Sequence, residues 1–147
     1  MRRGRQGALG KIAMVTAAVA FLACQQQTPE QELIRKTDAV GPWLAALQMA
    51  GEKWTVNSVP ARFVRTSVDA AQKAFTKAAR ETGRSAARAG LRDHLGRLIA
   101  GGQAESARLR QAVAAQDRRA AVPAIRALAA LSADFEALSK SVDEPSP

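Results

Sequence analysis

The chain of 147 residues contains one cysteine, one histidine and no tyrosine, and aromatic residues make up only 4% of it. A single cysteine cannot form an internal disulfide bond or a multi-thiolate metal site. A single histidine excludes metal sites that need two histidines, and it leaves any Ser-His-Asp enzyme dependent on that one residue. Disulfide scaffolds and the common zinc sites are therefore excluded.

Small apolar residues and basic residues are what the chain has in abundance. Hydrophobic residues make up 47% of it, which is more than a disordered chain contains, and 33 residues are alanine. The 22 Lys and Arg outnumber the 13 Asp and Glu, for a net charge of +9. The length suits one domain with a core of small side chains.

The first 24 residues have the order of a secretory signal peptide. Arg2, Arg3, Arg5 and Lys11 give the start a positive charge, residues 12–23 are uncharged and mostly apolar, and Cys24 follows. The apolar run is too short to span about 30 Å of hydrocarbon, which takes roughly 20 helical residues. We therefore expect residues 1–23 to direct export rather than to form a transmembrane helix.

The segment Phe21-Leu22-Ala23-Cys24 resembles the lipobox of bacterial lipoproteins. In that family the signal is cleaved before the cysteine, which becomes the first mature residue and carries acyl chains. The resemblance therefore implies cleavage between Ala23 and Cys24 and lipidation of Cys24, with palmitate among the acyl groups. Phe21 and Leu22 depart from the usual leucine and small residue at these places. Cleavage by the ordinary signal peptidase and an uncleaved anchor stay open as alternatives.

A lipidated Cys24 would attach the protein to a membrane without a transmembrane helix, because two or more acyl chains hold a protein stably at a bilayer. In enteric-type bacteria an aspartate after the cysteine marks retention in the inner membrane. By that resemblance Gln25 favours the outer membrane, with the domain facing the periplasm. Removal of residues 1–23 leaves 18 basic and 13 acidic residues, so the net charge falls from +9 to +5.

Apolar residues recur at helical spacing through the rest of the chain, and no segment alternates as a strand does. We expect an all-α, antiparallel four-helix bundle over residues 30–141, after a polar tether at residues 24–29 and before a flexible tail at residues 142–147. Thr28, Pro29 and Gln31 predict the capped start of the first helix. The expected buried stripes contain Phe63, Val64, Val68, Ala71, Phe75 and Ala78, then Leu91, Leu95, Leu98 and Ile99, and finally Ile125, Leu128, Leu131 or Ser132, Phe135 and Leu138.

Glycine and proline predict where the helices are interrupted. Gly41-Pro42 predicts a kink or a second helix start. Residues 51–59 are expected to form a loop that places Trp54 over one end of the bundle. Gly101-Gly102 either ends a helix or lies in a longer one that resumes through Leu109 and Val113. We favour a break or kink, because two glycines cost about 2 kcal/mol relative to alanine in a helix.

Three polar residues mark the later helix boundaries. Ser85 is expected to open a helix after Thr82-Gly83 ends the one before it. Asp117 is expected to cap the last helix or to lie in the turn before it, with Pro123 in the first turn of that helix.

Two side chains are candidates for a cofactor. His94 lies on the stripe of Leu91 and Leu95 and is expected at the edge of the core, where it could ligate non-covalent haem or a metal. Met49 is the only methionine after Cys24 and is a candidate second axial ligand. The simpler interpretation, which we favour, is a histidine hydrogen-bonded to a neighbour and a methionine that fills a gap in the core.

Arginine is the dominant basic residue, with 16 Arg against 6 Lys. Arg84, Arg88 and Arg92 are four residues apart and predict a positive ridge on one helix. Such a ridge suits anionic lipid headgroups, a polyanionic glycolipid or an acidic partner, although a solvated face is the simpler interpretation. We expect no nucleic acid as a partner, because the domain is exported and no aromatic residues are interleaved with the arginines.

Catalytic templates are not met. Gly101-Gly102 lacks the following Gly-Lys-Ser/Thr of a phosphate-binding loop, and the acidic residues form no recognisable metal pattern. A lipidated Cys24 leaves no thiol nucleophile. We therefore expect no enzymatic activity, no metal site and no cofactor.

Residues 109–135 resemble the last helical hairpin of the cytochrome c-prime type of four-helix bundle. Alanines, Asp117 at the turn and Leu128 match the family's frame over about 27 residues. The haem positions of the family then fall on Ser132, Phe135 and Glu136, so both attachment cysteines and the proximal histidine are missing. The resemblance implies the bundle architecture without covalent haem at that site.

These features lead to two functional hypotheses. The first is a lipid-anchored, non-enzymatic module of the cell envelope that binds an envelope protein of unknown identity, as an assembly or scaffold factor, with a homodimer also open. The alternative is a haem- or metal-binding bundle that uses His94 for electron transfer or ligand binding.

Overall fold

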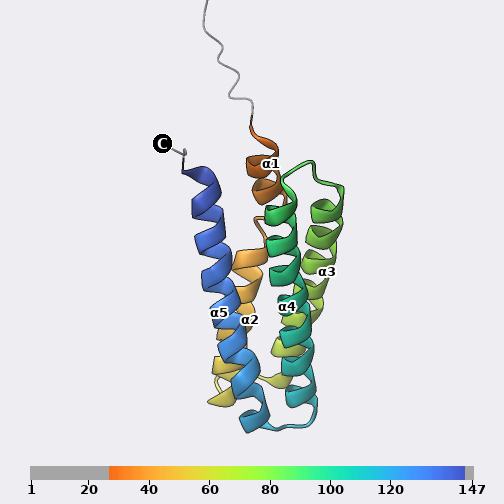
Figure 1. Ribbon diagram of the computed structural model, residues 1–147. Helices are drawn as coiled ribbons and strands as arrows, with labels where there is room; N and C mark the ends of the chain where they lie inside the picture. Colours follow the sequence, from red (N-terminus) through yellow and green to blue (C-terminus); the bar gives the residue numbers. More distant parts are fainter. Residues whose placement is uncertain (1–26, 145–147) are drawn as a thin grey trace, which may run out of the picture.

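The computed structural model describes residues 27–144, which contain five α-helices and no strand (Figure 1). The helices are α1 (Pro29–Lys36), α2 (Val40–Thr55), α3 (Ala61–Arg84), α4 (Ala89–Ala114) and α5 (Arg118–Asp143). Ala23, Cys24 and the predicted signal peptide lie outside these residues. No helix among residues 27–144 is long and apolar enough to cross a membrane.

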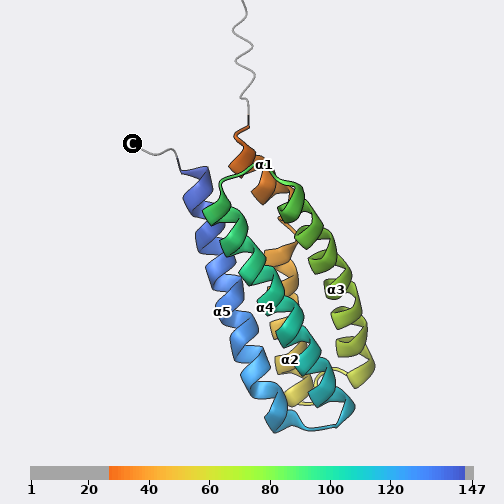
Figure 2. The ribbon, with the colours of Figure 1, turned by 45° about the vertical axis from the view of Figure 1, so that its right-hand side comes forward.

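Helices α2 to α5 form the predicted antiparallel four-helix bundle. Each packs against two neighbours, in the order α2, α3, α4, α5 and back to α2. Figure 2 shows the four rods running side by side, with the α2–α3 and α4–α5 connections at one end. The α3–α4 connection, α1 and both ends of the described chain lie at the other end.

Helices α1 and α2 together occupy one corner of the bundle. At 1.5 Å per residue, α4 with 26 residues is about 39 Å long, whereas α2 with 16 residues is only about 24 Å long. Helix α1 adds about 12 Å and packs against α3 and α5, the same two neighbours as α2. The predicted cap is confirmed, because the side chains of Thr28 and Gln31 each accept a hydrogen bond from the other residue's backbone N–H.

The interruption between α1 and α2 falls at residues 37–39, a few residues before Gly41-Pro42. A proline ring clashes with the carbonyl four residues earlier, which here is that of Asp38. The break therefore forms around Asp38, and Pro42 is left in the first turn of α2. The buried Thr37 closes α1, because its hydroxyl donates to the carbonyl oxygen of Leu33 at 2.9 Å.

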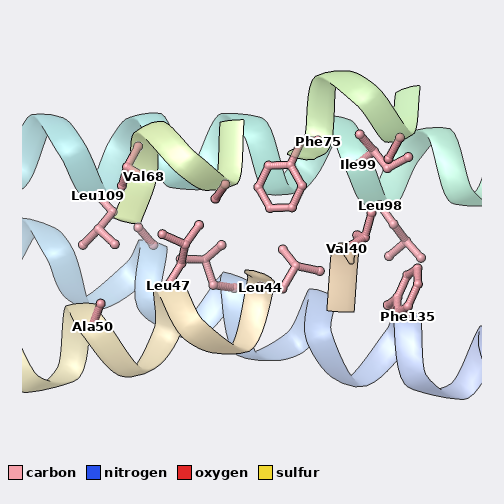
Figure 3. Close-up of a cluster of buried hydrophobic side chains, with 14 of the residues drawn as sticks. Val40, Leu44, Leu47, Ala50, Val68, Phe75, Leu98, Ile99, Leu109 and Phe135 are labelled. Carbon is pink, nitrogen blue, oxygen red and sulfur yellow. The ribbon is translucent and has the colours of Figure 1, made fainter. Parts of the chain in front are cut away.

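The core runs the length of the bundle and consists of leucine, isoleucine, valine, alanine and a few aromatic side chains (Figure 3). The predicted stripes are largely buried, but the expectation for Phe63 was wrong. Phe63 is 51% exposed, because it lies beside rather than on the stripe of Val64 and Val68. Leu131 and Leu138 are partly buried and pack against the core.

The predicted break at Gly101-Gly102 is absent, and α4 is continuous through both residues. A Cβ atom on Gly102 would lie 3.0 Å from Cδ2 of Leu44 and 3.2 Å from Cζ of Phe75. A Cβ on Gly101 would lie 3.1 Å from Cδ2 of Leu131. These glycines therefore make room for large side chains of three neighbouring helices, and that packing offsets their low helix propensity.

The predicted loop at residues 51–59 begins later, because α2 continues to Thr55. Gly51 is buried in the helix, and a Cβ there would lie 2.7 Å from Cγ1 of Ile125 on α5. Trp54 covers one end of the bundle as predicted, but from the last turn of α2, where only 2% of it is exposed.

The other boundaries differ by a few residues. Ser85 ends α3 rather than opening the next helix, and α4 begins at Ala89. Asp117 caps α5 as predicted, accepting from the N–H of Ala120 at 3.0 Å, so Pro123 falls in the second turn. Helix α5 continues through Asp143, two residues into the predicted tail.

Neighbouring side chains lie close to Gly51 but not to Gly96, so changing these two glycines to alanine should have opposite effects on stability. Gly51→Ala forces a methyl group against Ile125, so we expect a net loss of about 1 kcal/mol or more in the free energy of unfolding. Gly96→Ala in α4 meets nothing within 4 Å, so we expect a gain of up to about 1 kcal/mol. Urea unfolding followed by circular dichroism measures both, and equal stabilisation by the two changes would contradict the packing described.

Candidate functional site

The two candidate cofactor ligands are both exposed and lie far apart. The expectation that His94 lies at the core edge was wrong, because its side chain is exposed to solvent, one residue before the buried Leu95. Met49 is 57% exposed on α2. Met49 is two residues before Gly51, and Gly51 lies opposite Leu109 of α4. His94 precedes Leu109 by 15 residues, which corresponds to about 22 Å along α4. The two side chains are therefore not placed as axial ligands of one iron.

Cofactor sites in four-helix bundles are built in the core from side chains on facing helices. Here the centre of the core is filled by the side chains of Leu44, Phe75 and Leu95, each of which has no exposed surface. Among residues 27–144, no group of three or more His, Cys, Asp or Glu is placed to hold a metal ion. Among the described residues, the buried side chains are apolar except for Thr37, Thr82 and Ser106.

Arg84, Arg88 and Arg92 do not form the ridge predicted on one helix, because α3 ends at Arg84 and α4 begins only after Arg88. The backbone N–H of Arg88 donates to Oε1 of Glu30 at 3.2 Å, and its Nε lies 3.4 Å from the same oxygen. Nη1 of Arg92 donates to the carbonyl oxygen of Ser85 at 3.5 Å. Two of the three guanidinium groups are thus held by local contacts.

The net charge of the described domain lies in one half of it. We call residues 45–74 and 103–130 the basic half, and residues 27–44, 75–102 and 131–144 the terminal half. The boundary follows the contacts of Gly102 with Leu44 and Phe75.

The terminal half contains nine basic and nine acidic residues, and the basic half contains nine basic and four acidic residues. The whole surplus of +5 is therefore on the side of the α2–α3 and α4–α5 connections. The basic residues of that half are Lys53, Arg62, Arg65, Lys73, Arg108, Arg110, Arg118, Arg119 and Arg126.

The four acidic side chains of the basic half all have local partners. Asp69 pairs with Arg110, and Glu105 pairs with Arg108. Asp117 caps α5, and Glu52 accepts a hydrogen bond from the side-chain amide of Gln48 at 3.0 Å. In the part of the chain that the structure describes, Arg62, Arg65 and Arg119 are exposed and form no ion pair. Their charges are therefore available to a partner.

One arginine of the basic half is held in place. The guanidinium carbon of Arg118 lies 5.5 Å from the ring centroid of Trp54, and its Nη2 donates to the side-chain oxygen of Asn57. Asn57 adopts a left-handed conformation with φ of 58°, in the turn that follows α2. Beside these residues, between the two connections, is a hollow of about 390 Å³ that also contacts Val59, Pro60 and Gln116. The contacts fix Arg118 at the edge of this hollow.

All four large apolar side chains that the described residues expose belong to the basic half. Val56 is 67% exposed after α2, Phe63 is 51% exposed in the first turn of α3, and Val122 is 37% exposed near the start of α5. The fourth is Met49. Apolar and arginine side chains are therefore exposed together near the α2–α3 and α4–α5 connections. We call this end of the basic half, residues 53–65 and 116–122, the basic end.

The sequence contained part of this signal. The arginines at positions 118 and 119 are visible in it, and so is Phe63, which the spacing assigned to the core. Their grouping depends on the bundle topology, which places the start of α5 beside the α2–α3 turn. No protein-family model, no curated protein and no solved structure matches the chain.

The contact of Glu30 with Arg88 yields a test of the terminal half. The pKa of the Glu30 carboxyl is lowered, first by its own backbone N–H, next by the backbone N–H of Arg88 and then by the charge of Arg88. Arg88→Ala keeps both backbone donors, so we expect this pKa to stay below its ordinary value of 4.5. Carbon-13 NMR titration of the carboxyl measures it, and a return to the ordinary value would contradict the contact.

The same contact predicts a pH-dependent stability. Because the folded-state pKa is lowered, ionised Glu30 stabilises the fold above the ordinary carboxyl pKa, and this contribution is lost as the pH falls through the folded-state value. We expect Glu30→Gln to be less stable than the parent at pH 7. The difference should disappear in acid, as measured by urea unfolding at a series of pH values. A difference that persists at low pH would show that another effect of the substitution is responsible.

Proposed function

We propose that this protein is a lipid-anchored module of the bacterial cell envelope that binds another envelope component without catalysing a reaction. Acylated Cys24 attaches it to a membrane, and the outer membrane, facing the periplasm, is the location that Gln25 favours. The helical bundle is then a rigid body that presents a binding surface. The order of the basic start, the short apolar run and Cys24 in the sequence supports the anchor.

The observation that carries the proposal is the position of the chain ends. The start of α1 and the end of α5 both lie at the end of the bundle opposite the basic end (Figure 1). Four residue steps separate Cys24 from Thr28, and they span at most about 14 Å. A lipid on Cys24 would therefore hold the terminal half near the bilayer. The basic end, about 39 Å away along α4, would be the part farthest from the anchor.

The filled core supports a role in binding rather than in cofactor chemistry. Leu44, Phe75 and Leu95 occupy the centre where a bundle would hold a haem or metal. The surface, in contrast, exposes apolar side chains and a surplus of positive charge at one end. Aromatic and arginine side chains at a surface are typical of protein interfaces. Most of the exposed large apolar side chains and of the surplus positive charge are therefore at the basic end.

The anchor predicts the behaviour of a cysteine variant. The full chain should incorporate a radioactive fatty acid and fractionate with membranes, and Cys24→Ala should lose the label and the membrane attachment. Cys24→Ala/Gln26→Cys is the matched control, because it keeps one thiol but moves it out of the lipobox position. It should also lose the label. Membrane attachment of Cys24→Ala together with an unlabelled parent would overturn the proposal.

The membrane that holds the protein can be tested separately. In an enteric-type host, Gln25→Asp should shift the protein from the outer-membrane to the inner-membrane fraction of a sucrose gradient, while Gln25→Asn should leave it in place. The two variants differ only by a charge at the position that the resemblance identifies. If the parent already fractionates with the inner membrane, the assignment to the outer membrane is wrong.

A further inference from the structure

From the arrangement of charge and apolar side chains, we infer that the basic end docks onto an acidic protein surface that also presents apolar residues. Arg62, Arg65, Arg119 and the positioned Arg118 supply the charge, and Phe63 is the principal apolar contact. The inference rests on the proposed function for the direction in which the basic end faces. It adds the surface and the chemistry of the partner.

Charge complementarity argues for an acidic partner. The acidic side chains of the basic half are already paired, capping a helix or hydrogen-bonded, so its free arginines are not neutralised within the domain. In the terminal half, Lys36 pairs with Glu32 and Lys140 with Glu136, and the charges balance. A negative surface opposite the basic end would supply the missing counter-charges and steer the encounter.

The anchoring bilayer is not the partner that this arrangement favours. The Debye length at physiological ionic strength is about 8 Å, so charges that serve attraction to a nearby bilayer must lie close to it. The half next to the predicted anchor is neutral, and the surplus lies at the opposite end of a bundle about 39 Å long. The distribution is the reverse of the one that would hold the domain against its own membrane.

The exposed apolar groups favour a protein over a sugar or phosphate polyanion. Phe63 and Val56 are each more than half exposed at the same end as the arginines. A polyanionic polymer offers no apolar surface to cover them, whereas arginine and aromatic side chains are the common anchors of protein interfaces. A second copy of this chain is also disfavoured, because two basic ends would repel each other.

The size of the surface predicts a weak and salt-sensitive complex. Helices in a bundle are 8–10 Å apart, so the end of four helices is roughly 20 Å wide and offers about 400 Å². This is small for a stable interface, which buries about 800 Å² on each partner. Binding should therefore rely on electrostatic attraction and should weaken as the salt concentration rises.

The experiment uses the full chain in its own cells, with the photo-crosslinking residue p-benzoyl-phenylalanine at position 63. The replaced side chain is aromatic and half exposed, so the fold should tolerate it. We expect an adduct with one protein, and mass spectrometry should place the crosslink in a segment that is rich in Asp, Glu and apolar residues. The same probe at Thr76, an exposed position in the terminal half of α3, should not give this adduct.

Charge-reversal variants show whether the arginines direct the contact. Arg62→Glu/Arg119→Glu at the basic end should lower the adduct yield about five-fold or more. Arg80→Glu/Arg84→Glu changes the net charge equally at exposed positions of the terminal half and should leave the yield unchanged. All four side chains are exposed, so a loss of folding does not account for the contrast. Circular dichroism of each variant checks this.

Three results of the crosslinking experiment would overturn the inference: adducts with lipid or polysaccharide, a crosslink in a segment without acidic residues, or no adduct at position 63. Equal losses in the two charge-reversal variants would also overturn it. Failure of the anchor is separable, because fatty-acid labelling and fractionation of Cys24→Ala measure it without the crosslinker. A labelled, membrane-bound protein that gives no adduct would remove the docking surface and leave the anchor intact.

Discussion

The close approach of the helices at small residues is the constraint on which the rest of the structure depends. A Cβ on Gly41 would lie 2.7 Å from Cδ1 of Phe135, and one on Gly51 would lie 2.7 Å from Cγ1 of Ile125. Because Gly41 and Gly51 have no Cβ atom, α5 can pack large side chains against α2 at these positions. A chain with 33 alanines has few large apolar groups, so the few that it has must interlock closely to exclude water.

Local signals in the sequence predicted the helical class, the stripes and two caps, but they misplaced several boundaries. Thr28 and Asp117 cap helices through contacts within three residues, so the sequence displays the whole motif. The helix propensity of glycine is equally low whether the residue ends a helix or faces a large side chain of a neighbouring helix. The role of Gly51 and Gly102 depends on Ile125, Leu44 and Phe75, which are far away in sequence. Spacing alone could not distinguish the two cases.

The candidate site shows the same division between local and long-range information. A spacing of four residues predicted a ridge from Arg84 to Arg92, and it failed because the α3–α4 connection lies between these residues. His94 and Phe63 each lie one residue before a buried position of their helix. A shift of one residue along a helix is enough to turn a side chain from the core to solvent. The basic end draws residues from two connections that only the topology brings together. A net charge of +5 does not indicate where the surplus lies.

If Cys24 carries the proposed lipid, the partition of charge sets the distance from the membrane at which the proposed partner would present its acidic surface. In an antiparallel bundle each end contains both helix N-termini and C-termini, so the helix dipoles largely cancel and side chains dominate the potential there. That potential decays over about 8 Å in physiological salt. With a tether of at most about 14 Å and a bundle of about 39 Å, the basic end reaches roughly 50 Å from the bilayer that Cys24 would enter. A rigid bundle fixed at its other end would thus select partners by their distance from the membrane as well as by their charge.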